Sequence, residues 1–66
     1  MQVRIGSLVM WNKRGSEDYG CMGLVTYILD STLLDYYYFT VQWTDNTLVE
    51  YGSDEICDEN IKVVKF

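Results

Sequence analysis

The chain contains no histidine and no proline, and only two of its 66 residues are cysteines. Without histidine, the commonest general base of enzymes is missing. Two thiols alone cannot complete a structural zinc site, which takes four nitrogen or sulfur ligands. Cys57 lies among four carboxylates, which oppose formation of a reactive thiolate, and we interpret Cys21 as a small buried apolar side chain. These absences favour a protein that is not an enzyme and that uses no metal and no cofactor.

Long apolar runs and basic residues are also scarce. No run approaches the roughly 18 apolar residues of a membrane span, and the N-terminal segment does not resemble a signal peptide. We therefore expect a cytoplasmic protein with reduced thiols. Residues 1–29 carry three basic and two acidic residues, whereas residues 30–66 carry two basic and eight acidic ones. Because nucleic-acid binding depends on lysine and arginine, this charge distribution argues against a nucleic-acid-binding protein. The acidic half either keeps the protein in solution or attracts a basic protein partner.

β-Branched and aromatic residues dominate the chain and helical periodicity is weak, which predicts an all-β fold. The expected strands cover residues 2–11, 21–29, 36–44, 47–51 and 60–65. The polar, glycine-flanked residues 12–20 predict a loop. Gly6 and Gly23 fall inside expected strands, where glycine marks a bulge or a sharp bend.

Three shorter connections are predicted from turn chemistry. Residues 30–35 form a turn region of mixed character. Asp45 and Asn46 tolerate a positive φ and lie between two apolar runs, as a tight hairpin turn requires. Residues 52–56 predict a single helical turn capped by the side chain of Ser53.

The central aromatic strand is interpreted by parity, because alternate strand residues face opposite sides of a sheet. The uniformly apolar or aromatic set should face the core, and its members are Tyr37, Phe39, Val41 and Trp43. The other set should face outward, and its members are Tyr36, Tyr38, Thr40, Gln42 and Thr44. Outward tyrosines are typical of an interface; the alternative is that residues 30–35 cover Tyr36 and Tyr38.

Three segments, "LVMW", "GLVTYI" and "FTVQWTDNTLVEYGSDEI", resemble Tudor-like and related SH3-like barrels. The matching positions are Val9 and Trp11, Gly23 and Val25, and Val41, Trp43 and Asp45. The similarity covers residues 3–65 and implies one domain over residues 1–66, a five-stranded SH3-like (Tudor-like) small barrel with one short helical turn before the last strand. The chain also resembles small SH3-like proteins encoded by tailed phages, marine ones especially, which would place it in the host cytoplasm.

The Tudor resemblance also implies a ligand site. In methyl-lysine-reading Tudor domains, aromatic side chains surround an alkylammonium group through cation–π attraction. Trp11 and Trp43 match two of these aromatics, and Asp45 supplies a carboxylate. The aromatics expected early in the second strand and after the hairpin are missing, and Tyr19 substitutes for one of them. The alternative is that Trp11 and Trp43 only cap the core of a small barrel.

Two functional hypotheses follow. The first is a non-enzymatic protein-interaction or structural module that forms a homo-oligomer or docks on a larger protein through outward Tyr36 and Tyr38. The second is a Tudor-like binding module that takes a basic or methylated side chain through the partial aromatic cage. Its residues are Trp11, Tyr19, Trp43 and Asp45.

Overall fold

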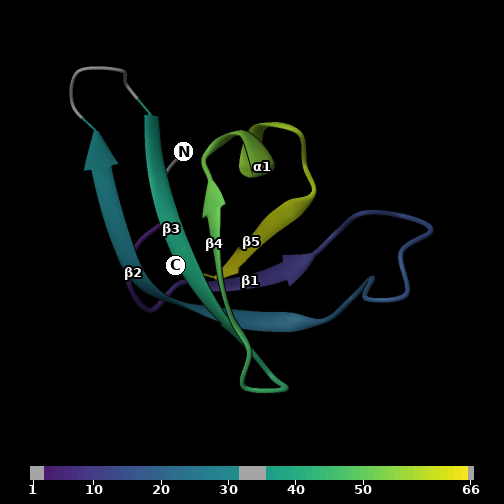
Figure 1. Cartoon of the computed structure of the whole chain (residues 1–66). Coiled ribbons are helices and arrows are strands. Elements are labelled where there is room, and N and C mark those ends of the chain that lie inside the picture. The colour runs from purple at the N-terminus through teal and green to yellow at the C-terminus, as the bar shows by residue number, and fades with distance from the viewer. Residues whose placement is uncertain (1–2, 32–35, 66) are drawn as a thin grey trace.

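The computed structural model describes residues 3–31 and 36–65. The elements, in chain order, are β1 (Leu8–Trp11), β2 (Met22–Ser31), β3 (Tyr36–Trp43), β4 (Leu48–Gly52), α1 (Asp54–Cys57) and β5 (Ile61–Lys65) (Figure 1). The prediction of an all-β fold with five strands and one helical turn before the last strand is confirmed. Within these described ranges, no helix is long and apolar enough to cross a membrane.

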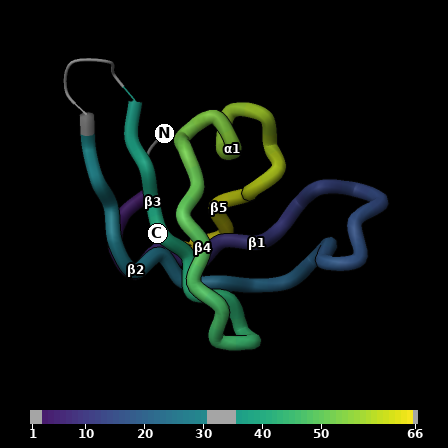
Figure 2. Tube along the Cα trace, in the orientation of Figure 1, coloured from purple at the N-terminus to yellow at the C-terminus, as the bar shows by residue number. Residues whose placement is uncertain are grey.

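The five strands form one antiparallel sheet in the order β4-β3-β2-β1-β5. Strand β2 is shared by both halves of this sheet: it passes beneath β1 and then turns to run beside β3 (Figures 1 and 2). The register shifts between Val25 and Tyr27, which leaves Thr26 as one extra residue in β2. Such a bulge bends its strand, so the bend occurs at Thr26 and not at Gly23, where the sequence placed it.

The first strand is shorter than predicted and begins at Leu8. A turn precedes it: Gly6 has a φ of 94°, and the Ser7 amide donates a hydrogen bond to the Arg4 carbonyl at 2.9 Å. The Ser7 hydroxyl oxygen in turn accepts from the Arg4 amide at 2.8 Å. These local bonds satisfy the backbone groups that a strand would have paired elsewhere. Gly6 therefore permits a left-handed turn and is not a strand bend.

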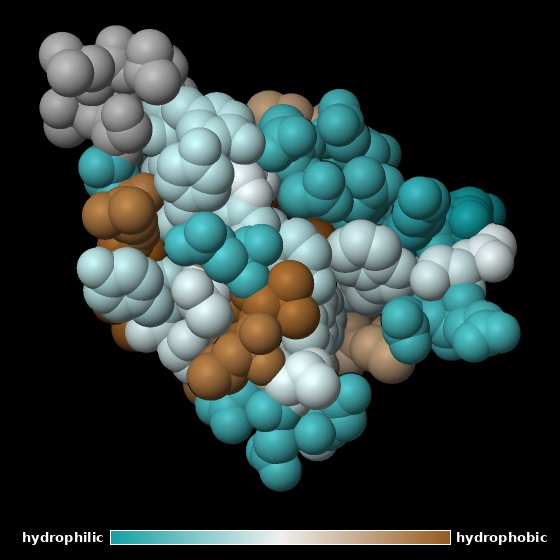
Figure 3. Space-filling model, viewed as in Figure 1, coloured by the Kyte–Doolittle hydropathy of each residue, from teal (hydrophilic) through white to brown (hydrophobic). Residues whose placement is uncertain are grey.

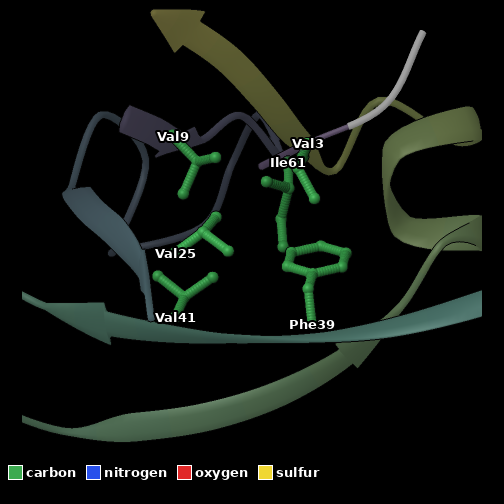
Figure 4. Close-up of a cluster of buried hydrophobic side chains, with 6 residues drawn as sticks. All are labelled: Val3, Val9, Val25, Phe39, Val41 and Ile61. Atoms are coloured by element: carbon green, nitrogen blue, oxygen red, sulfur yellow. The ribbon is translucent and has the colours of Figure 1, made fainter. Parts of the chain in front are cut away.

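The core consists of six buried side chains: Val3, Val9, Val25, Phe39, Val41 and Ile61. Figure 4 shows Phe39 extending from β3 toward Ile61 and Val3, and Val41 facing Val25. Phe39 is 1% exposed and Val41 is fully buried, while Tyr37 and Trp43 pack against this cluster. The parity prediction for the inward side of β3 is thus confirmed.

The connections on either side of β4 differ in detail from their predictions. In the hairpin, Asn46 has a positive φ of 70°, and Asp45 does not. Ser53 precedes α1, but its side chain makes no capping hydrogen bond to the helix. The Ser53 hydroxyl oxygen instead accepts a 3.5 Å bond from the Tyr37 amide, so this side chain ties the helical turn to β3.

Candidate aromatic pocket

Three aromatic rings from three different strands meet at one end of the sheet. Trp11 ends β1, Trp43 ends β3, and Tyr51 lies in β4. The ring centroids are 6.3 Å apart for Trp11 and Trp43, 6.0 Å for Trp11 and Tyr51, and 6.1 Å for Trp43 and Tyr51. Both pairs that include Trp43 are edge-to-face, at 88° and 87°, which is a preferred geometry for aromatic pairs. We call these three residues the aromatic triad.

Hydrogen bonds hold the polar tips of the triad. The Trp43 indole N–H donates to the Tyr51 hydroxyl oxygen at 3.1 Å. The Trp11 indole N–H donates to the Ser16 hydroxyl oxygen at 3.1 Å, and the same oxygen accepts from the Asp18 amide at 3.2 Å. Burial raises the pKa of Tyr51, and the indole of Trp43 opposes this effect in part. The Tyr51 phenol is therefore neutral at physiological pH, and both indole donors are satisfied within the protein.

Gly23 leaves space for the Trp43 ring of the aromatic triad. A Cβ atom at this position would meet the Val41 side chain and would lie 2.7 Å from Trp43 Cε3. The absence of a side chain lets the Trp43 ring lie directly on the backbone of β2. Glycine at position 23 is thus a packing requirement of the indole, which explains its place inside a strand.

The triad lines a pocket of about 250 Å³. Two carboxylate side chains, from Asp18 in the first loop and Asp45 in the hairpin, also line it, and Cys21 contributes a thiol. Cys21 is exposed and free, so its interpretation as a buried apolar side chain is wrong: it lies at the end of the loop, just before β2, and lines the pocket. The pocket combines aromatic walls with negative charge, which is the surrounding that a cation prefers.

The charge of Asp45 is fixed by its neighbour in the hairpin. The Thr47 hydroxyl donates to Asp45 Oδ1 at 2.6 Å, and the Thr47 amide donates to the same oxygen at 3.1 Å. These bonds lower the pKa of Asp45, the hydroxyl contributing more than the amide, because they stabilise the ionised form. The Asp45 carboxylate at the pocket therefore stays ionised at a lower pH than an ordinary aspartate.

Of the four predicted ligand-binding residues, the structure brings three together and leaves one apart. Trp11, Trp43 and Asp45 line the pocket, whereas Tyr19 is 48% exposed and does not line it. The third aromatic is Tyr51, which the sequence prediction missed because the resemblance puts the aromatic after the hairpin at position 48 or 49, where leucine and valine stand. Its signal was the two-residue period of a strand, which places Tyr51 on the same face as Val49.

The two predicted interface tyrosines differ in their surroundings. Tyr38 is 41% exposed, and its ring lies 5.1 Å from that of Tyr36 in an edge-to-face pair. The Tyr36 hydroxyl donates to Asp54 Oδ1 at 2.6 Å, and this bond raises the pKa of Tyr36 to about 12. Tyr36 therefore has an intramolecular partner, contrary to the expectation that both tyrosines lack one. The alternative cover, residues 30–35, falls largely on positions 32–35, outside the described residues.

No protein-family model matches this chain, and the searches of curated proteins and of solved structures also returned no match. Within residues 3–31 and 36–65, no group of three or more acidic or cysteine side chains is placed to hold a metal ion.

Proposed function

We propose that this protein is a non-enzymatic SH3-like, Tudor-like module that binds a cationic side chain of a partner protein in the aromatic pocket. The supporting observation is the triad of Trp11, Trp43 and Tyr51 with the carboxylates of Asp18 and Asp45 at the same pocket. A cation over an aromatic face gains about 0.5–1 kcal/mol when exposed and about 2 kcal/mol when desolvated. The strand order and the helical turn before β5 support the barrel assignment.

The size of the pocket supports a side-chain head group as the ligand. Clefts that take drug-sized molecules measure about 300–1,000 Å³, and this one measures about 250 Å³. An ammonium, a methylated ammonium or a guanidinium group on an aliphatic stem fits such a volume. We place the interaction in the cytoplasm, of the host if the chain is viral, in keeping with two free and exposed cysteines.

Titration with peptides, followed by tryptophan fluorescence, tests the binding function. One peptide carries trimethyl-lysine, a second carries lysine, and a third carries a neutral tert-butyl isostere of trimethyl-lysine. We expect saturable binding of the charged peptides, about tenfold tighter than binding of the neutral one. No saturable change at millimolar peptide, or equal affinity for the neutral isostere, would end the proposal.

A matched pair of double variants separates the pocket from overall charge. Asp18→Asn with Asp45→Asn removes the two carboxylates of the pocket. Asp58→Asn with Glu59→Gln removes two acidic groups that follow α1 and do not line the pocket. We expect severalfold weaker binding in the first variant and unchanged binding in the second, because salt screens exposed charges that lie away from the ligand.

A second candidate function is self-association through the outer face of β2 and β3. Tyr27 is 55% exposed, Leu29 51% and Tyr38 41%, and Leu29 pairs directly with Tyr38 across the two strands. Because the bulge at Thr26 reverses the parity of β2, Tyr27 and Leu29 join the outward tyrosines. Light scattering on the wild type and on Tyr36→Ser with Tyr38→Ser tests this candidate; a monomer in both cases would remove it.

A further inference from the structure

Strand β4 lies at the edge of the sheet. It pairs with β3 on one side, and no other strand of the described chain lies on its other side. The Trp43 amide bonds to the Thr47 carbonyl at 2.9 Å, and the Ser53 amide bonds to the Tyr37 carbonyl at 2.8 Å. In an antiparallel pair, such bonds alternate along the strand. The amide and carbonyl groups of Leu48, Glu50 and Gly52 therefore point away from β3.

This edge carries few of the features that protect edges. Edge strands are usually blocked by lysine, proline, bulges or a covering segment. The pairing of β4 with β3 runs without a register shift, and β4 contains neither lysine nor proline. Leu48 is 63% exposed and Val49 is 39% exposed. Figure 3 shows hydrophobic surface along the lower part of β4, which an added strand would cover.

The same strand forms one wall of the aromatic pocket. Val49 and Tyr51 line the pocket, whereas Leu48 and Glu50 alternate with them and face the other side of the sheet. A strand added to β4 follows the same alternation. Its residue opposite Val49 or Tyr51 points to the pocket side, and the next residue along points to the side of Glu50.

Two kinds of strand could pair with β4, namely β4 of a second copy or a segment of another protein, and the charges near this edge distinguish between them. Glu50 is the central residue of β4. If a second copy paired its own β4 about a two-fold axis centred on this residue, the two Glu50 side chains would lie opposite each other, and like charges directly opposite are destabilising. Asp45 and Asp18 add negative charge at the neighbouring pocket. The edge is thus suited to a basic segment of another protein and unsuited to a second copy.

We propose that β4 accepts an extended basic peptide as an additional strand, with two adjacent basic residues as its signature. One basic side chain enters the aromatic pocket, and its neighbour lies against Glu50. The peptide backbone pairs with the free groups of Leu48 and Glu50. This inference rests on the proposed function for its first basic side chain and adds the conformation and the second charge of the ligand.

Backbone methylation of a peptide tests the strand pairing. The probe is a capped six-residue peptide with two central lysines flanked on each side by valine and threonine, and the reference ligand is lysine capped at both ends. Two further peptides carry N-methyl groups on one or the other alternate set of amides. We expect one set to weaken binding by about tenfold or more, because it removes edge hydrogen bonds. We expect the other set to bind like the parent.

The second charge is tested with Glu50→Gln, matched by Glu59→Gln. We expect Glu50→Gln to weaken the two-lysine peptide by roughly threefold and to leave the capped lysine unchanged, while Glu59→Gln changes neither. If capped lysine binds but both methylated peptides bind like the parent, the strand pairing is overturned and the pocket function stands. If neither ligand binds, both proposals fail. If β4 of a second copy occupies the edge instead, sedimentation shows a dimer that Glu50→Gln strengthens and that the two-lysine peptide does not dissociate, which also overturns the inference.

Discussion

Substitution of Gly23 by alanine tests how the pocket is built into the core. Glycine inside a strand is ordinarily less favourable than alanine by roughly 0.5–1 kcal/mol, so strand preference considered by itself predicts a stabilised variant. The structure predicts the opposite. The new methyl group would meet Val41, which is fully buried, and would lie 2.7 Å from Trp43 Cε3, a distance that requires one of these side chains to move.

The expected magnitude follows from two opposing effects. Overpacking of a core costs about 1–3 kcal/mol, and the strand preference of alanine offsets roughly 0.5–1 kcal/mol of this. We expect the free energy of unfolding to fall by about 1–2 kcal/mol. For a domain of this size, 1 kcal/mol shifts Tm by roughly 4–8 °C, so Tm should fall by about 5–15 °C.

The assay is thermal unfolding followed by circular dichroism, with Gly52→Ala as the matched variant. Gly52 also lies in a strand, but a Cβ atom there would meet the tip of the Tyr36 side chain, with Tyr36 Cζ at 2.8 Å. That tip can swing outward at the cost of its exposed hydrogen bond to Asp54, so Gly52→Ala should change Tm less than Gly23→Ala, which disturbs the buried core. Equal or higher stability of Gly23→Ala relative to the wild type would refute the packing argument for Trp43.

Two further predictions concern titration. Asp54→Asn should lower the pKa of Tyr36 from about 12 toward its ordinary value of 10.0, as measured by tyrosinate absorbance, and the control Asp58→Asn should leave this pKa unchanged. In the wild type, the stability that Tyr36 contributes is fully present below pH 10 and is lost as the pH rises toward 12. Thr47→Val should raise the pKa of Asp45 in a carbon-detected NMR titration, because it removes the stronger of two hydrogen-bond donors. The stability that Asp45 contributes is fully present when the pH is above the ordinary pKa of 3.8, and it is lost as the pH falls through the lowered pKa.

Local rules were sufficient for the parts of the molecule whose structure depends on near neighbours. The alternation in β3 placed Phe39 and Val41 in the core, because burial of one strand face follows directly from a two-residue period. The tight turn at Asn46 and the helical turn before β5 were also predictable, since both depend on backbone preferences of a few adjacent residues.

The candidate site was predictable only in part. Trp11, Trp43 and Asp45 were found through resemblance, and they do line one pocket. The two-residue period puts Tyr51 on the same face as Val49, but its contact with Trp11 depends on where β4 lies relative to β1, which no local pattern in the sequence states. Ser16 was missed because its hydrogen bond to Trp11 depends on how the loop after β1 folds back on that strand.

The amino-acid sequence by itself determined an all-β chain, its acidic charge and the inward side of its central strand, because these depend on composition and on short-range periodicity. Tertiary structure alone decided that Thr26 is the bulge, that Tyr36 bonds to Asp54 and that three aromatics line one pocket. Each of these outcomes depends on how a sheet bends and on which strands become neighbours. Both depend on close packing between segments that are far apart in the sequence.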